Sequence, residues 1–300
     1  MRRKPGSNRR SVPLLSLCAA LLLAVPAGSS FAQPTAAPAA RACGEVVTIA
    51  THDRSTTRYA FAQKEGVPTH GVPIALVLLV GGGGDLALDD QGCPRALTRN
   101  SLIRMQPFWR ESGFVTVLVD APSDLRGEDG LAGFRTTRQH AEDLGKVIAD
   151  VRARMSGPVW LVGHSRGTIS AANAAARLTG PAAPDGLVLL SAMMVGEASK
   201  RKPFVVQTVF DPPLAAIAVP VLVIGHQADN CVRSPASLMG DITARTHGPR
   251  QQTVAVTGGP IAPGRAPNIG DCGVGEPHDY VDQEGELAAG IARFIGGGVY

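Results

Sequence analysis

The stretch V-W-L-V-G-H-S-R-G-T-I-S, residues 159–170, leads four apolar residues into a turn that places one serine between two glycines. It is either an ordinary glycine turn or a strained turn that holds the Ser165 hydroxyl in a defined position. The apolar residues before the turn favour a buried strand, and the alanine-rich residues 168–178 favour a helix. Gly163 and Gly167 lie where small residues let a strand and a helix approach closely. The pattern predicts a nucleophile elbow, with the serine oxygen exposed between strand and helix.

Short apolar runs alternate with helical patterns along the chain after about residue 45. Runs without polar residues are typical of strands buried on both faces of a parallel sheet. The alternation predicts an α/β fold with a doubly wound, mostly parallel sheet of about eight strands flanked by helices. We expect strands near 45–50, 59–61, 73–80, 114–120, 158–162, 186–190, 220–224 and 252–256, and helices near 134–155, 168–178, 234–245 and 282–295.

A serine hydroxyl is a poor nucleophile unless a histidine, oriented by a carboxylate, takes its proton. After an elbow of this type the residues follow in the order serine, acid, histidine. His278, in G-E-P-H-D-Y, comes after the last expected strand and before the last expected helix. Asp229 follows the expected strand 220–224, whereas Asp271 and Asp279 follow no strand of their own. We therefore expect Ser165, Asp229 and His278 to form a catalytic triad.

Acyl transfer also needs hydrogen-bond donors for the oxyanion of the transition state. The backbone N–H of Arg166, directly after the serine, is one expected donor. The second is expected at Gly82 or Gly83, because the glycine run 81–84 follows a strand and leaves main-chain N–H groups accessible. The Arg166 side chain could bind an anionic substrate group or fix a neighbouring loop, and we favour the loop. His164 is expected to point away from the serine as a packed or solvated neighbour.

Residues 1–32 combine a basic start, an apolar run over 12–28 and the residues S-F-A before Gln33, which is typical of a cleaved export signal. Residues 33–42 are expected to form a flexible tether and residues 43–300 a single domain. The apolar run is short and broken by prolines, so no stable membrane insertion is expected after cleavage. Either the general secretory or the twin-arginine route fits. The mature protein is expected in the periplasm or outside the cell.

The four cysteines beyond the signal predict two disulfides, because an even number is typical of exported domains. If acid and base meet at one sheet edge, their loops run side by side. That placement predicts a bond between Cys231 and Cys272 and, by elimination, one between Cys43 and Cys93. No C-x-x-C occurs, so a zinc site is a poor interpretation.

The formal charge of +4 does not indicate a nucleic-acid partner, because five basic residues in the first ten positions account for the excess. A phosphate-binding loop is excluded at 81–84, since no Gly-Lys-Ser/Thr follows the glycines. We expect no metal and no cofactor.

With these residues identified, the chain resembles the α/β-hydrolase superfamily over about 73–297. The segments L-L-V-G-G-G-G-D-L, V-D-A-P-S-D, W-L-V-G-H-S-R-G-T, V-L-V-I-G-H-Q-A-D-N-C and E-P-H-D-Y occur in the order of that family. The chain is similar to the exported bacterial branch with a G-H-S-R-G elbow. Only residues 191–218 separate the expected sixth and seventh strands, which implies no large lid.

The resemblance implies a serine hydrolase that cleaves an ester-type bond of a small-molecule acyl substrate. Thioesterase and amidase or peptidase activity on the same triad are alternatives, because all pass through a tetrahedral intermediate. A glycine run replaces the His-Gly start common in lipases and esterases, so the substrate stays open, as does the oligomeric state. A non-catalytic binding protein that keeps the fold is the less favoured second class.

Overall fold

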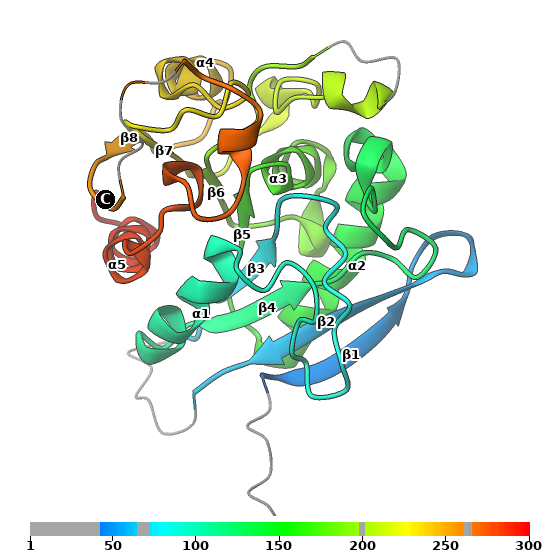
Figure 1. Cartoon of the computed structure of the whole chain (residues 1–300). Helices are drawn as coiled ribbons and strands as arrows, with labels where there is room; N and C mark the ends of the chain where they lie inside the picture. The colour runs from blue at the N-terminus through cyan, green and yellow to red at the C-terminus, as the bar shows by residue number, and fades with distance from the viewer. Residues whose placement is uncertain (1–42, 65–71, 198–201, 261–263, 265) are drawn as a thin grey trace, which may run out of the picture. The chain divides into compact units, whose positions relative to one another are not determined.

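Eight strands form one sheet in the computed structural model, which describes residues 43–64, 72–197, 202–260, 264 and 266–300 (Figure 1). The order across the sheet is β1-β2-β4-β3-β5-β6-β7-β8. β1 pairs antiparallel with β2 and β2 with β4, and every other neighbouring pair is parallel. The expectation of a mostly parallel sheet of about eight strands is confirmed. The strands are β1 (Glu45–Ala50), β2 (Thr56–Ala62), β3 (Ala75–Leu79), β4 (Val115–Val119), β5 (Val159–His164), β6 (Gly186–Leu190), β7 (Val221–His226) and β8 (Gln251–Val256).

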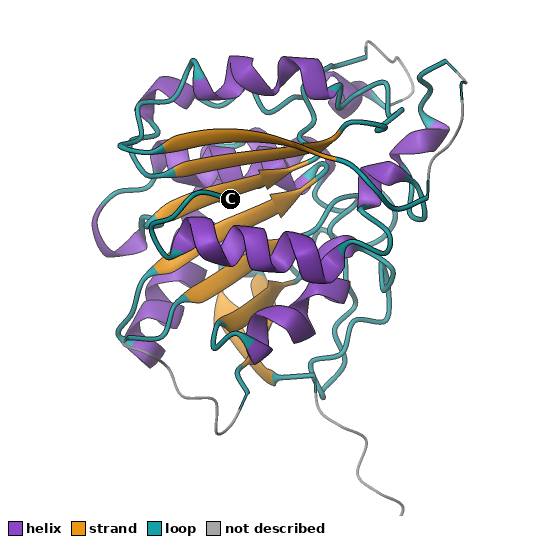
Figure 2. Cartoon of the chain, turned by 90° about the vertical axis from the view of Figure 1, so that its left-hand side faces the viewer, coloured by secondary structure: helices purple, strands orange, loops and turns teal. Residues whose placement is uncertain are grey.

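Helices cover both faces of the sheet (Figure 2). α1 and α5 lie on one face, where Trp109 and Phe294 pack against Leu76 and Leu78 of β3. α2, α3 and α4 lie on the other face, where the alternate β3 residue Val77 joins their core. Because both faces are buried, every residue of the strands from β3 to β7 is buried, which explains their largely apolar sequences. The helices are α1 (Ser101–Glu111), α2 (Arg138–Met155), α3 (Gly167–Arg177), α4 (Met239–Thr243) and α5 (Glu284–Ile295).

The helices differ from the sequence expectation at three places. α1 was not expected: it contains Pro107, which usually ends a helix, but its buried apolar face and the Asn100 cap stabilise it. The helix expected over 134–155 begins at Arg138, because the Thr137 side chain caps it by accepting from the His140 N–H. The helix expected over 234–245 is reduced to α4 and a short 3-10 turn.

The segment between β6 and β7 contains no helical lid within its described residues, 191–197 and 202–220. It holds only the 3-10 turns Pro203–Val206 and Leu214–Ala216. No helix in the described part of the chain is both long and apolar enough to span a bilayer. The expected signal 1–32 and tether 33–42 lie outside the described residues, so the division of the chain stays a prediction.

Gly163 and Gly167 allow β5, α3 and β3 to meet beneath the β5–α3 turn. A Cβ atom on Gly163 would lie 2.7 Å from the carbonyl oxygen of Gly167. A Cβ atom on Gly167 would lie 1.9 Å from the carbonyl oxygen of Leu79 at the end of β3. Both distances are shorter than a real Cβ contact, so a larger residue at either position forces the backbone apart.

We expect Gly167→Ala to lower the free energy of unfolding by about 2–3 kcal/mol, because the added methyl group displaces the end of β3. Urea denaturation followed by circular dichroism measures the change. Gly240→Ala in α4 is the matched control: its Cβ would meet nothing within 4 Å, so we expect a change of less than about 1 kcal/mol, towards higher stability. Equal effects of the two variants would contradict the contact.

Candidate active site

Ser165 lies in a strained turn between β5 and α3. Its φ of 52° is in the left-handed region, which residues other than glycine rarely adopt. The Ser165 N–H donates to the Leu190 carbonyl at 2.9 Å, and the Ser165 carbonyl accepts from the Thr168 hydroxyl at 2.6 Å. Because both backbone groups are held, the side chain is the part of the residue left to project from the turn. The turn thus has the geometry expected of a nucleophile elbow.

The structure brings together the three residues singled out as nucleophile, acid and base. His278 Nε2 lies 3.0 Å from Ser165 Oγ, and His278 Nδ1 lies 2.9 Å from Asp229 Oδ2. The side chains of His278 and Asp229 are 1% and 0% exposed, so water does not compete for the contact between them. Ser165 follows β5, Asp229 follows β7, and His278 lies between β8 and α5, as the sequence argument expects.

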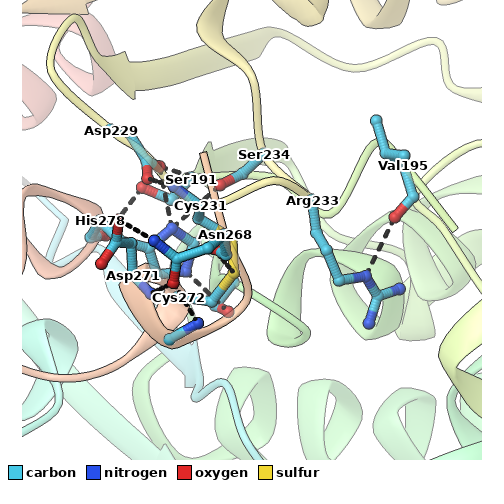
Figure 3. Close-up of a disulfide and its surroundings, with 12 residues drawn as sticks. Ser191, Val195, Asp229, Cys231, Arg233, Ser234, Asn268, Asp271, Cys272 and His278 are labelled. Atoms are coloured by element: carbon cyan, nitrogen blue, oxygen red, sulfur yellow. Dashed lines mark hydrogen bonds and ion pairs between the residues drawn. A yellow bond between two sulfur atoms is a disulfide. The ribbon is translucent and has the colours of Figure 1, made fainter. Parts of the chain in front are cut away.

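Ser234 is a fourth member of this cluster that the sequence analysis missed (Figure 3). Its hydroxyl donates to Asp229 Oδ2 at 2.9 Å and lies 3.0 Å from His278 Nδ1. The other carboxylate oxygen, Asp229 Oδ1, accepts from the Cys231 N–H at 2.8 Å. The carboxylate is therefore fixed at both oxygens. No signal in the sequence marks Ser234, because its partners are reached only when the loop after β7 folds back.

His164 holds the backbone of His278. Its Nδ1 accepts from the Asn100 amide Nδ2 at 3.0 Å, because the amide oxygen already accepts from the Leu102 N–H. His164 Nε2–H then donates to the His278 carbonyl at 3.0 Å, which also accepts from Ser191 Oγ at 2.8 Å. Burial lowers the pKa of His164 to about 4, so the ring is neutral at pH 7. His164 is packed, as expected, but its contact with the base was missed.

Asp279 follows His278 in the sequence, but its carboxylate accepts hydrogen bonds from residues of α1. Oδ1 accepts from the Ser101 N–H at 2.9 Å, and Oδ2 accepts from Arg104 at 2.7 Å. Asp271 accepts from the Asn268 amide at 2.7 Å. In both cases the partners are consistent with the choice of Asp229 as the acid.

Both expected disulfides are present in the structure, Cys231–Cys272 and Cys43–Cys93. The first joins the loop after Asp229 to the loop before His278, with the two Cα atoms 4.5 Å apart (Figure 3). Asp229, Cys231 and His278 have potential ligand atoms within 4.8 Å of one another. The sulfur of Cys231 is bonded to Cys272, however, so it is not available as a thiolate ligand.

The glycine run lies directly against the serine. A Cβ atom on Gly81 would lie 2.8 Å from Ser165 Cβ, and Gly82 has a φ of 57°. The backbone N–H groups of Gly82, Gly83 and Arg166 donate to no other described residue. These are the three groups expected to bind an oxyanion.

A cavity of about 230 Å³ opens over Ser165 and His278, between Leu97 and Val274. A second cleft, of about 630 Å³, is lined by the glycine run and by Arg166. Gly82 and Leu97 line both, so the two spaces are neighbours at the glycine run.

Arg135 lies behind the glycine run and is 1% exposed. Its guanidinium donates to the carbonyl oxygens of Val80 and Gly82 and to Ser170 Oγ, at 3.3, 3.2 and 2.8 Å. No carboxylate pairs with it among the described residues, and its Nε has no hydrogen-bond partner there. Burial lowers the pKa of Arg135 well below its usual range. A guanidinium stays protonated in proteins, so a positive charge that pairs with no described carboxylate supports the loop from inside the protein, a feature without any signal in the sequence.

The similarity to known proteins is one of fold. No protein-family model and no curated protein matches the sequence. An α/β serine hydrolase without a lid from Xanthomonas campestris aligns at 18% identity over 83% of this chain and 94% of its own, with a TM-score of 0.51. Dienelactone hydrolase from Anabaena variabilis aligns at 14% identity over 85% and 97%, with a TM-score of 0.52. An esterase from Rhodococcus sp. aligns at 14% identity over 84% and 98%, with a TM-score of 0.50. The chain therefore has the α/β-hydrolase fold.

The buried imidazole of His164 predicts a specific response to acid. Its pKa of about 4 lies below the value of about 6.5 for an unfolded histidine, so the unfolded chain binds the extra proton first. We expect this group to lower the free energy of unfolding by roughly 3 kcal/mol as the pH falls from 6.5 to 4. In NMR spectra the His164 ring should stay neutral, with its proton on Nε2, down to pH 5. Titration of His164 above pH 6 would contradict this.

Proposed function

We propose that the protein is a serine hydrolase that cleaves an ester-type bond of a small acyl substrate. The observation behind this proposal is the hydrogen-bonded chain from Ser165 Oγ through His278 to Asp229, with distances of 3.0 and 2.9 Å. These distances lie within the range that general-base activation of a serine requires. Similarity in fold to an esterase and to a serine hydrolase supports the reaction class.

The first chemical step is the attack of Ser165 on the substrate carbonyl. His278 Nδ1–H donates to Asp229, which leaves the lone pair of Nε2 to accept the serine proton. As the bond between Oγ and the carbonyl carbon forms, the proton moves to Nε2. The Asp229 carboxylate stabilises the imidazolium that results, and Ser234 and Cys231 keep that carboxylate in place.

The oxyanion of the tetrahedral intermediate is bound by the Arg166 N–H and by the N–H of Gly82 or Gly83. All three N–H groups lack a donor contact within the described chain, so they need not give up a hydrogen bond to bind it. Arg135 acts as a positioning residue here. Its bonds to the Val80 and Gly82 carbonyls polarise those peptide groups, and its unpaired charge favours negative charge nearby.

Collapse of the intermediate completes the half-reaction. His278 Nε2–H gives its proton to the leaving alcohol oxygen, and the acyl group stays on Ser165. A water molecule then repeats the sequence, with His278 as its base, and releases the acid. Thioesters and amides pass through the same intermediates, but ester cleavage is the least demanding of the three.

We also propose that the protein works outside the cytoplasm, after removal of residues 1–32. The two disulfides support an oxidising compartment, because such bonds are rare in reducing ones. Residues 33–42 then form the tether and residues 43–300 the hydrolase domain. The second class, a non-catalytic binding protein, is separated from an enzyme by the labelling experiment below.

A fluorophosphonate probe tests the nucleophile. We expect labelling of the wild-type protein, no labelling of Ser165→Ala, and a labelling rate at least roughly 10³-fold lower in His278→Ala, because each removes part of one catalytic unit. Ser112→Ala, at the exposed end of α1, is the control and should be labelled at the wild-type rate. Mass spectrometry of the labelled peptide identifies the site. Wild-type labelling of Ser165→Ala would refute the proposal.

The two disulfides provide a matched pair of variants. Cys231→Ala/Cys272→Ala and Cys43→Ala/Cys93→Ala open loops of 41 and 50 residues, so each is expected to lower the free energy of unfolding by about 4 kcal/mol. Only the first loosens the loops that hold Asp229 and His278. We expect its fluorophosphonate labelling to be roughly 10- to 100-fold slower than that of the second, because displaced catalytic groups react slowly. Equal rates, measured where both variants are folded, would show that the bridge does not position the site.

A further inference from the structure

The Arg166 side chain is a cation without an acceptor, next to the nucleophile. It lies in the cleft of about 630 Å³ and stacks over the ring of Phe204, with its Cζ 4.6 Å from the ring centroid. It makes no hydrogen bond or ion pair with any described residue. A stacked guanidinium uses its face for the ring, so its N–H groups, which lie in the plane, stay available to a ligand.

The neighbouring loop, which the sequence favoured Arg166 to fix, is held by hydrogen bonds from Arg233. The Arg233 guanidinium donates to the Val195 carbonyl oxygen at 3.0 Å (Figure 3). It also donates to the carbonyl oxygens of Val205 and Gln207, at 2.5 and 3.1 Å. These bonds hold the segment that contains Phe204. Arg166 contacts the same segment through the Phe204 ring, without a hydrogen bond to a described residue, and its part in fixing the loop stays a prediction.

The other charged side chains of the cleft already have partners. Asp85 pairs with Arg126 at 2.8 Å, and Lys202 pairs with both Glu128 and Asp129, at 3.0 and 2.7 Å. Burial lowers the pKa of Arg166 to about 10, with the charge of Arg233 acting in the same direction and Asp129 against it. Arg166 is therefore charged at neutral pH, and it is the cleft cation that lacks a carboxylate in the described chain.

We propose that the Arg166 side chain binds a carboxylate of the substrate, so that the protein hydrolyses esters of acidic small molecules. This proposal rests on the proposed function. A partly buried guanidinium has lost part of its hydration, and a carboxylate restores its hydrogen bonds through a bidentate contact. A singly charged group fits better than a phosphate, because one unpaired positive charge faces it and Glu128 and Asp129 line the same cleft.

The position of Gly82 connects this site with the reaction. Gly82 lines both the cavity over Ser165 and the cleft with Arg166, so one small substrate can place its ester in the first and its carboxylate in the second. The apolar Leu97 side chain lies beside Gly82 and also lines both spaces. Arg166 is therefore the charged side chain next to the elbow that can recognise a charged group of the substrate.

Two pairs of esters show which part of the substrate has the carboxylate. In p-nitrophenyl hydrogen glutarate and its methyl ester, the charge that differs lies on the acyl group. In p-acetoxybenzoate and its methyl ester, it lies on the leaving group. For at least one pair we expect the wild-type protein to have a higher kcat/KM for the acid than for the methyl ester. A preference for the methyl ester in both pairs would overturn the proposal.

The variant Arg166→Gln keeps the backbone N–H and removes the guanidinium. We expect it to lower the ratio of kcat/KM for the acid to kcat/KM for the methyl ester by roughly 10- to 100-fold. Arg95→Gln is the matched control, since it removes one positive charge from an exposed side chain that pairs with Asp89. Its ratio should stay within about twofold of the wild type. An unchanged ratio in Arg166→Gln would overturn the proposal.

Failure of the proposed function is recognised separately, because Ser165 would then not react with the fluorophosphonate. The carboxylate site is still testable by calorimetry on Ser165→Ala protein. We expect p-nitrophenyl hydrogen glutarate or p-acetoxybenzoate to bind with a Kd at least roughly tenfold lower than that of its methyl ester. Adding Arg166→Gln should remove this difference. Equal Kd values for acid and methyl ester in both pairs would overturn the carboxylate site, whatever the outcome of labelling.

Discussion

The close contact between the first residue of α3 and the end of β3 is the constraint on which the site depends. Gly167 approaches the Leu79 carbonyl so closely that no Cβ fits between them. This contact sets Ser165 beside Gly81, where a Cβ atom on Gly81 would lie 2.8 Å from the Ser165 Cβ. Ser165 and the glycine run, the proposed nucleophile and the proposed oxyanion-binding loop, are thus positioned by the same backbone packing. A sheet with a wider spacing at this point would separate them.

His278, the proposed base, is positioned mainly through its backbone. His164 and Ser191 both donate to the His278 carbonyl, and the Tyr280 hydroxyl links the Ser191 N–H to the Ile224 carbonyl. The ends of β5, β6 and β7 therefore meet the His278 loop through hydrogen bonds between buried groups. Because Asp229 orients only the ring, the position and the orientation of His278 have separate supports. The His164 ring must be neutral for Nδ1 to accept from Asn100 while Nε2–H donates to His278. Burial keeps it neutral, because it lowers the pKa of His164.

Two arginines that pair with no carboxylate in the described part of the chain flank the glycine run, and burying a charge without a partner is costly. Arg135 lies inside the protein and binds the Val80 and Gly82 carbonyls, whereas Arg166 faces the cleft and stacks on Phe204. Both make the surroundings of Ser165 favourable for negative charge. The inner arginine suits the charge that develops during the reaction, and the outer one suits a charge that the substrate brings with it.

The sequence by itself determined the sheet, the elbow and the order of Ser165, Asp229 and His278. Strands buried on both faces are largely apolar, and only glycine fits at 163 and 167, so local sequence patterns are enough to predict these features. The tertiary structure decided the roles of His164, Ser234, Arg135 and Arg166, as well as the existence of α1 despite Pro107. Their roles depend on whether a group from a distant segment pairs with a buried donor or charge, or whether no group does. These pairings form only once the loops at the carboxyl ends of the strands have come together.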